Sequence, residues 1–167
     1  MTTQGKRTAV AVAVAALAMN WSSAFAQSAP AAPPVVTNTI VGPGYYVSDM
    51  ARSLRFYRDV LGMSVRLQFG PKDKPDVVVG FGPDPSKPSL MLLSDRSGAV
   101  ARPIQHGHGY SRVALLMADV RDLSARLKAA GFSPGEIRVV HGSSLMMMVD
   151  DPDGYKIEII DSRPVKP

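Results

Sequence analysis

The sequence contains no cysteine, which excludes disulfides, zinc–cysteine sites, thiol nucleophiles and lipidation at a cysteine. It also lacks an apolar run long enough to cross a bilayer. The longest run, from Ala9 to Met19, falls short of the roughly 20 residues that a membrane-spanning helix needs. Runs of basic residues are missing too, and aromatic residues make up only 7% of the chain. We therefore exclude nucleic-acid binding as a function class.

What remains is the composition of an ordinary globular protein, with 46% hydrophobic and 20% charged residues in 167. These proportions exclude a wholly disordered, collagen-like or coiled-coil chain. The length suffices for one well-packed domain and is too short for two. Packing, rather than covalent cross-links, must stabilise that domain.

The first residues have the pattern of a secretory signal peptide. Lys6 and Arg7 precede the apolar run, and the small-x-small triplet 24–26 follows it. We expect cleavage after residue 26 and a periplasmic or secreted protein without membrane attachment; an uncleaved anchor is the alternative. Cleavage removes two basic residues, which lowers the formal charge from +5 to about +3.

The next segment, residues 27–38, holds Pro30, Pro33 and Pro34 among alanine and serine, a composition typical of an extended linker. We expect a single folded domain over 39–163 and a short tail over 164–167.

Two helices are predicted from apolar residues at helical spacing, one over 50–61 and one over 120–130. Asp49 and Asp119 stand at the N-cap positions, and Gly62 and Gly131 at the ends. The two aspartates are 70 residues apart, which indicates an internal duplication.

Short apolar segments bounded by turn formers predict four strands around each helix. In the first half they cover 44–47, 64–69, 76–81 and 89–93, and in the second half 112–117, 136–141, 145–149 and 155–160. Each half has the order strand, helix, strand, strand, strand. We expect an α+β fold in which two βαβββ repeats form a curved mixed sheet around a cleft, with the helices outside.

Two motifs carry a resemblance to a known family. They are Val47-Ser-Asp-Met-Ala-Arg-Ser-Leu-Arg-Phe-Tyr-Arg-Asp-Val-Leu-Gly62 and Asp151-Pro-Asp-Gly-Tyr-Lys-Ile-Glu158. In these the chain resembles the vicinal oxygen chelate superfamily, which includes glyoxalase I, bleomycin-resistance proteins and extradiol dioxygenases. The resemblance covers about residues 39–162 and implies the βαβββ fold. It is less specific for the reaction, because unrelated activities share one fold.

In metal-binding members of this family each half supplies two ligands, usually His, Glu or Gln. The resemblance places these four positions on Gly42, Met91, Arg112 and Glu158. Glycine has no donor atom, thioether sulfur is a poor ligand for hard or borderline divalent ions, and guanidinium repels cations. Only Glu158 keeps a usual ligand, whereas a catalytic metal needs about three. We therefore expect no metal cofactor, with a divalent metal as the alternative.

Arg112 and Glu158 are predicted to form an ion pair where relatives hold their ion. If the pair is buried, Arg112→Ala should lower the free energy of unfolding by about 3 kcal/mol. We take Arg112, Glu158, Tyr46, Met91 and His141 as candidates for the ligand-binding cleft. His106 and His108 could chelate a metal together with Glu158, although a glycine-flanked connector explains them as well.

Three functions stay open at this point. The first is a ligand-binding module of the bleomycin-resistance type, whose cleft holds a small molecule without metal and is often completed by a second subunit in a homodimer. The second is a metal-dependent glyoxalase-like lyase or isomerase, or a ring-cleaving dioxygenase. The third is an exported interaction domain without catalysis.

We predict that the exported protein begins at Gln27, because the cleavage pattern ends at Ala26. Intact-mass spectrometry of the protein recovered from the periplasm or medium should give the mass of residues 27–167. A mass that includes Met1 would contradict this prediction.

Overall fold

The computed structural model describes residues 40–97, 103–161 and 163, all of which belong to one compact unit, Asn38–Pro167. The predicted signal peptide (1–26), linker (27–38) and tail (164–167) lie outside the described residues. No described helix is long and apolar enough to cross a membrane.

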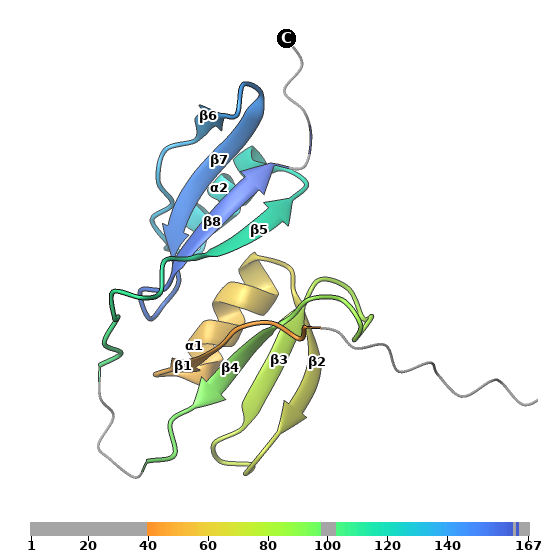
Figure 1. Cartoon of the computed structure of the whole chain (residues 1–167), viewed down its shortest axis with the longest axis vertical. Coiled ribbons are helices and arrows are strands. Elements are labelled where there is room, and N and C mark those ends of the chain that lie inside the picture. The colour runs from red at the N-terminus through yellow and green to blue at the C-terminus, as the bar shows by residue number, and fades with distance from the viewer. Residues whose placement is uncertain (1–39, 98–102, 162, 164–167) are drawn as a thin grey trace, which may run out of the picture. The chain divides into compact units, whose positions relative to one another are not determined.

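Each half of the chain forms its own four-stranded mixed sheet (Figure 1). The first half consists of β1 (Gly44–Val47), α1 (Met50–Leu54), the π-helical segment η1 (Arg55–Val60), β2 (Ser64–Phe69), β3 (Asp76–Gly80) and β4 (Leu90–Ser94). The second consists of β5 (Val113–Met117), α2 (Val120–Ala129), β6 (Arg138–Val140), β7 (Ser144–Asp150) and β8 (Lys156–Asp161). The strand orders, β1-β4-β3-β2 and β5-β8-β7-β6, are equivalent. The predicted α+β fold of two βαβββ repeats is thus confirmed.

The helix ends follow the predicted capping chemistry in both halves. Asp49 accepts a hydrogen bond from the Arg52 amide, and Asp119 accepts from the Arg121 and Asp122 amides. Gly62 and Gly131 follow the helices with φ of +80° and +86°, a conformation that glycine adopts without strain. The duplication inferred from the two aspartates is therefore present in the backbone.

The first helix departs from a regular α-helix after its first turns. From Arg55 it continues as a π-helix, in which the Leu61 amide bonds the Phe56 carbonyl at 2.9 Å. The wider turns still place Phe56, Tyr57 and Val60 in the core. The apolar spacing of the sequence does not distinguish the two helix types.

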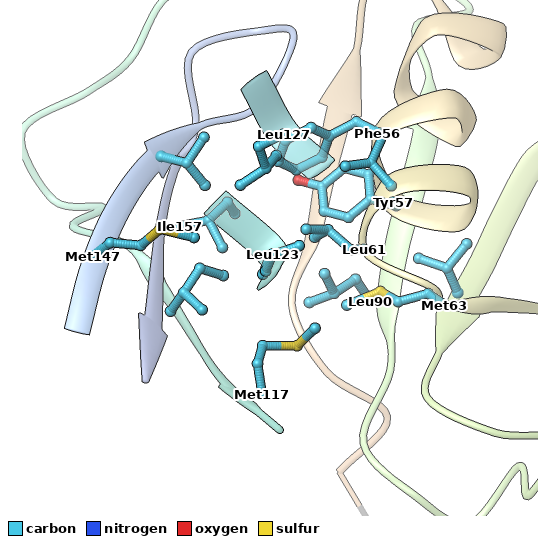
Figure 2. Packing of buried hydrophobic residues seen from close by; sticks show 14 of the residues in the cluster. Phe56, Tyr57, Leu61, Met63, Leu90, Met117, Leu123, Leu127, Met147 and Ile157 are labelled. Atoms are coloured by element: carbon cyan, nitrogen blue, oxygen red, sulfur yellow. The ribbon is translucent and has the colours of Figure 1, made fainter. Parts of the chain in front are cut away.

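One hydrophobic core joins the two halves through their helices. Phe56, Tyr57 and Leu61 pack together with Leu123 and Leu127 of α2 (Figure 2). At the same junction Arg126 donates to the Val60 carbonyl at 2.5 Å. The sequence led us to expect both helices outside a single curved sheet. The structure differs, because it has two sheets and the helices pack between them in one core. Each covers one face of its own sheet, and the apolar faces of the two helices pack against each other.

A buried chain of hydroxyl groups adds polar contacts across the same junction. Tyr45 donates to the Tyr57 hydroxyl at 2.5 Å, and Tyr57 donates to Asp151 Oδ2 at 2.8 Å. The backbone amides of Asp153 and Tyr155 donate to the other Asp151 oxygen, both at 2.9 Å. This chain links β1 and the first helical segment to the turn between β7 and β8.

Replacing Tyr57 by phenylalanine should lower the free energy of unfolding by about 1–3 kcal/mol, because the Tyr45 hydroxyl loses its acceptor and Asp151 loses a donor inside the protein. Urea unfolding monitored by circular dichroism measures this change. Tyr110→Phe is the matched control. Tyr110 is partly exposed, and its hydroxyl has no hydrogen bond to the described residues. A change below 0.5 kcal/mol in Tyr57→Phe, equal to the control, would contradict a stabilising role for the chain.

Candidate functional site

Each sheet has one face covered by a helix and one face without such a cover, which we call the first and second open face. In β4, Leu90 and Leu92 belong to the core, so the alternation of side chains directs Met91 and Leu93 to the first open face. In β8, Ile157 and Ile159 belong to the core, so Glu158 and Ile160 lie on the second open face. The first open face comprises Tyr46, Leu67, Val78, Met91 and Leu93; the second comprises Ala114, Leu116, Met146, Met148, Glu158 and Ile160.

The backbone closes the position of Gly42. Its φ is +142°, and a Cβ atom built there would lie 1.6 Å from the carbonyl oxygen of Ser89. The Ser89 amide donates to the Val41 carbonyl at 2.6 Å, which holds the two segments together. A side chain at residue 42 therefore requires the backbone to move.

The predicted ion pair between Arg112 and Glu158 is present. Arg112 Nε donates to Glu158 Oε2 at 2.7 Å, and Nη1 donates to the Ser111 hydroxyl at 3.3 Å. The side chains are 48% and 17% exposed, respectively. Because the arginine is half exposed, solvent screens the pair. The loss of unfolding free energy expected for Arg112→Ala therefore falls from the roughly 3 kcal/mol of a buried pair to about 1 kcal/mol or less.

The neighbours of this pair are set by strand register. Ala114 and Met148 lie directly opposite Glu158 on its two sides, and Leu116 and Met146 lie opposite Ile160. Beyond the methionines, a small hollow of about 110 Å³ is lined by Gly135, Glu136, Arg138, Met146 and Met148. The ion pair thus stands beside apolar, adaptable side chains rather than among further ligands.

At the four positions that the family resemblance indicates, Glu158 is the one side chain with a usual ligand atom for a divalent cation. Residue 42 offers no donor atom and no space for one, and Met91 offers only a thioether. The remaining carboxylate, Glu158, already neutralises a guanidinium. Throughout the residues that the structure describes, no group of three or more His, Cys, Asp or Glu could hold a metal ion.

The three histidines do not gather around Glu158. His106 Nε2 lies 2.8 Å from the Asp153 carbonyl oxygen, and its ring packs edge-on against Tyr155. His108 is exposed in the connector between the halves. His141 is exposed in the turn after β6, with φ of +48°. The structure therefore assigns His106 a packing contact with the turn that follows β7.

Tyr45 and Tyr46 point to opposite sides of β1. Tyr45 is buried, whereas Tyr46 is 54% exposed and lies opposite Leu93 on the first open face. Tyr46 and Tyr155 also line a surface hollow of about 410 Å³ beside residues 103–105 of the connector.

Two features escaped sequence reasoning. One is the hydroxyl chain ending at Asp151, a residue that the turn motif explains on its own. Burial raises the pKa of this carboxyl group and also the pKa values of Tyr45 and Tyr57, so both tyrosines keep their protons. The signal available in the sequence was an aspartate that follows an apolar strand and can face the core.

The second feature is a largely apolar cavity of about 550 Å³ between the first half and β5. It is lined by Met63, Val79, Leu90 and residues 113–116, among others, with Lys87 and Arg66 at its polar side. Arg66 is occupied, since it donates to the carbonyls of residues 81, 82, 87 and 88 and to the Ser89 hydroxyl. Neither Arg112 nor Glu158 lines this cavity, although Ala114, which does line it, lies directly opposite Glu158.

Comparison with known proteins agrees with this architecture. The family model of the Glyoxalase/Bleomycin resistance protein/Dioxygenase superfamily matches residues 38–159. The probable lactoylglutathione lyase of Synechocystis sp. is 31% identical over 125 residues, which cover 70% of this chain and 89% of the relative. The lactoylglutathione lyase of Salmonella typhimurium is 32% identical over 124 residues, 70% and 87% of the two chains.

A solved structure, glyoxalase I from Leishmania major, superimposes with a TM-score of 0.62 at 27% identity and covers 75% of this chain and 87% of the other. The shared repeat, the extent of the family match and the identity to the two lyases agree. The chain belongs to the Glyoxalase/Bleomycin resistance protein/Dioxygenase superfamily.

Proposed function

We propose that this protein binds a small molecule on its second open face without a divalent metal. The observation that carries the proposal is the 2.7 Å contact between Arg112 and Glu158. It places a permanent cation beside the one carboxylate that the family motif retains. A carboxylate needs a compensating positive charge when it is removed from water, and here the guanidinium supplies it.

The closed backbone at Gly42 supports the same proposal. If only a side chain had been lost there, a rotation of a neighbouring residue could restore a donor. The positive φ and the contact with Ser89 leave no such space. Position 42 of the first half therefore supplies no ligand to an ion.

A metal-dependent glyoxalase-like lyase is the second candidate. It is favoured by the curated names of the relatives, which are lactoylglutathione lyases. Those names describe the relatives. In this chain the four positions of the family's metal ligands hold Gly42, Met91, Arg112 and Glu158, and these residues argue against the same metal-dependent activity.

We also propose that the protein acts after export, in the periplasm or outside the cell. Support comes from the basic start, apolar run and small-residue triplet of the N-terminus. The mass measurement described above tests this location.

The metal-free proposal predicts that the exported protein, purified without chelators, contains zinc, nickel, iron and manganese far below one ion per chain. Elemental analysis measures the content. Thermal-shift screening with aromatic and dicarbonyl compounds should give melting temperatures and ligand-induced shifts that EDTA does not change.

Two variants sharpen the experiment. Glu158→Gln should leave the metal content unchanged, as should Glu136→Gln, whose side chain is exposed. Gly42→His adds the kind of ligand that relatives use, yet we expect it to lower the melting temperature without binding metal. Stoichiometric metal that disappears in Glu158→Gln but not in Glu136→Gln would overturn the proposal and restore the lyase.

We further propose that two copies assemble into a homodimer in which open faces meet. Leu116 is 66% exposed and Leu67 56% exposed, both on open faces. Exposed apolar side chains gathered on one surface are typical of an interaction site. Among the described residues β1 pairs only with β4, and β5 only with β8, so each has an edge free for another strand.

Light scattering coupled to size-exclusion chromatography should therefore give twice the mass of the processed chain. Leu116→Lys should shift the population towards the monomer, because it places a charge on the second open face. Val139→Lys is the control, since Val139 is as exposed but lies opposite the core residue Leu145. A single-chain mass at 100 µM protein would contradict the homodimer.

A further inference from the structure

We propose that the ligand of the second open face carries a planar anion, a carboxylate, which Arg112 holds while an apolar ring system lies over Met146 and Met148. This inference rests on the proposed function and narrows it to a class of ligand. It follows from the unused hydrogen-bonding groups of the ion pair, from the neighbouring charges and from the spacing of the strands.

Arg112 has more hydrogen-bond donors than its contacts within the protein use. A guanidinium group has five N–H bonds and stays protonated at all physiological pH values. Within the described part of the chain its acceptors are Glu158, through Nε, and the Ser111 hydroxyl, through Nη1. Nη2 has no acceptor among these residues. The pair is thus held by one contact and not by two parallel ones, which leaves donors of the Nη1–Nη2 edge unused.

That edge has the geometry that a carboxylate requires. Two parallel N–H donors bind the two oxygens of a carboxylate at once, which adds both strength and orientation. The half-exposed Arg112 head shows that solvent, and hence a ligand, reaches the group. Ser111, already in contact with the guanidinium, has a hydroxyl proton that can be donated to the same anion.

The neighbouring cations, Lys156 and Arg138, each lie close to a carboxylate. Lys156, near the same end of the sheet, contacts both oxygens of Asp150 at 2.7 Å and is therefore neutralised. Arg138 lies 4.0 Å from Glu136 and is largely exposed at the far edge. Of these cations, Arg112 combines a fixed position on the second open face with unused donors.

Beyond its anion, the ligand must reach from β5 across β8 to β7. β5 and β7 are separated by β8, so two strand spacings of about 4.8 Å lie between them. From the guanidinium at the start of β5 to the hollow at Met146 and Met148 a ligand must span roughly 10 Å. A fused pair of aromatic rings with an attached carboxylate has about this length.

The side chains along this path suit such a ring system. Ala114 is small and leaves room beside Glu158, while Leu116, Ile160 and the two methionines provide apolar contacts. Methionine adapts its shape to a ligand and makes favourable contacts between sulfur and aromatic rings. The charged side chains along this path are Glu158 and, at the hollow, Glu136 and Arg138, which lie 4.0 Å from each other.

The test compares 2-naphthoate with its neutral analogue 2-naphthamide, using isothermal titration calorimetry on the EDTA-treated full chain at pH 7. Naphthoate should bind at least tenfold more tightly. Arg112→Gln should reduce this preference to within twofold, and Arg112→Lys should retain part of it, because lysine keeps the charge but not the planar pair of donors. Arg121→Gln, on the exposed side of α2, should change nothing.

Glu158→Gln separates recognition by Arg112 from a merely structural role of the ion pair. Removing the competing carboxylate should strengthen naphthoate binding severalfold, whereas a structural role would weaken it together with thermal stability. Equal affinities for the two probes, unaffected by Arg112→Gln, would overturn the carboxylate inference and leave metal-free binding intact. Binding of both probes that is lost on EDTA treatment and restored by zinc would instead overturn the proposed function itself.

Discussion

A single helix can cover only one face of a four-stranded sheet, and the architecture of this protein depends on that limit. Each half has four strands and one helical segment. The covered faces bury Leu92 in one half and Ile157 and Ile159 in the other, and the helices then bury each other. Within the described residues neither half has a second helix that could cover the other face of its sheet. The opposite sheet faces remain open, and they are the surfaces to which the proposed ligand and the proposed second copy are assigned.

The junction of the halves combines apolar and polar contacts with different consequences. The packing of Phe56 against Phe132 and α2 supplies burial without direction. The hydrogen bond from Tyr57 to Asp151 requires a particular orientation of the helix relative to the turn between β7 and β8. Burial disfavours the charged form of Asp151 and raises its pKa, whereas its three protein donors stabilise the carboxylate. Hydrophobic contacts hold the halves together, and the chain of hydrogen bonds from Tyr45 through Tyr57 to Asp151 fixes the orientation of the first helix relative to the turn.

Much of this could be predicted from the sequence, because the relevant physics is local. Asp49 and Asp119 cap the next residues in the chain, and alternating apolar residues identify the strands that contain Met91 and Glu158. The ion pair between Arg112 and Glu158 was predictable from the family resemblance, which places the two residues at positions that converge on one ion in metal-binding relatives. The conformation of Gly42 was not, because it depends on Ser89, 47 residues away, and on an arginine that holds the loop before Ser89. Nor could spacing reveal that the helices face each other.

The alternation of side chains along a strand explains how the site can change while the fold persists. Met91 stands between Leu90 and Leu92, and Glu158 between Ile157 and Ile159, so each site residue has two core residues as its chain neighbours. Because successive side chains point to opposite faces, a substitution at a site position removes no contact from the core behind it. Loss of a metal ligand therefore costs the fold little, provided that the remaining charges are balanced. In this chain the charge of Glu158 is balanced by the guanidinium of Arg112, just before the adjacent strand, which cannot dissociate as an ion can.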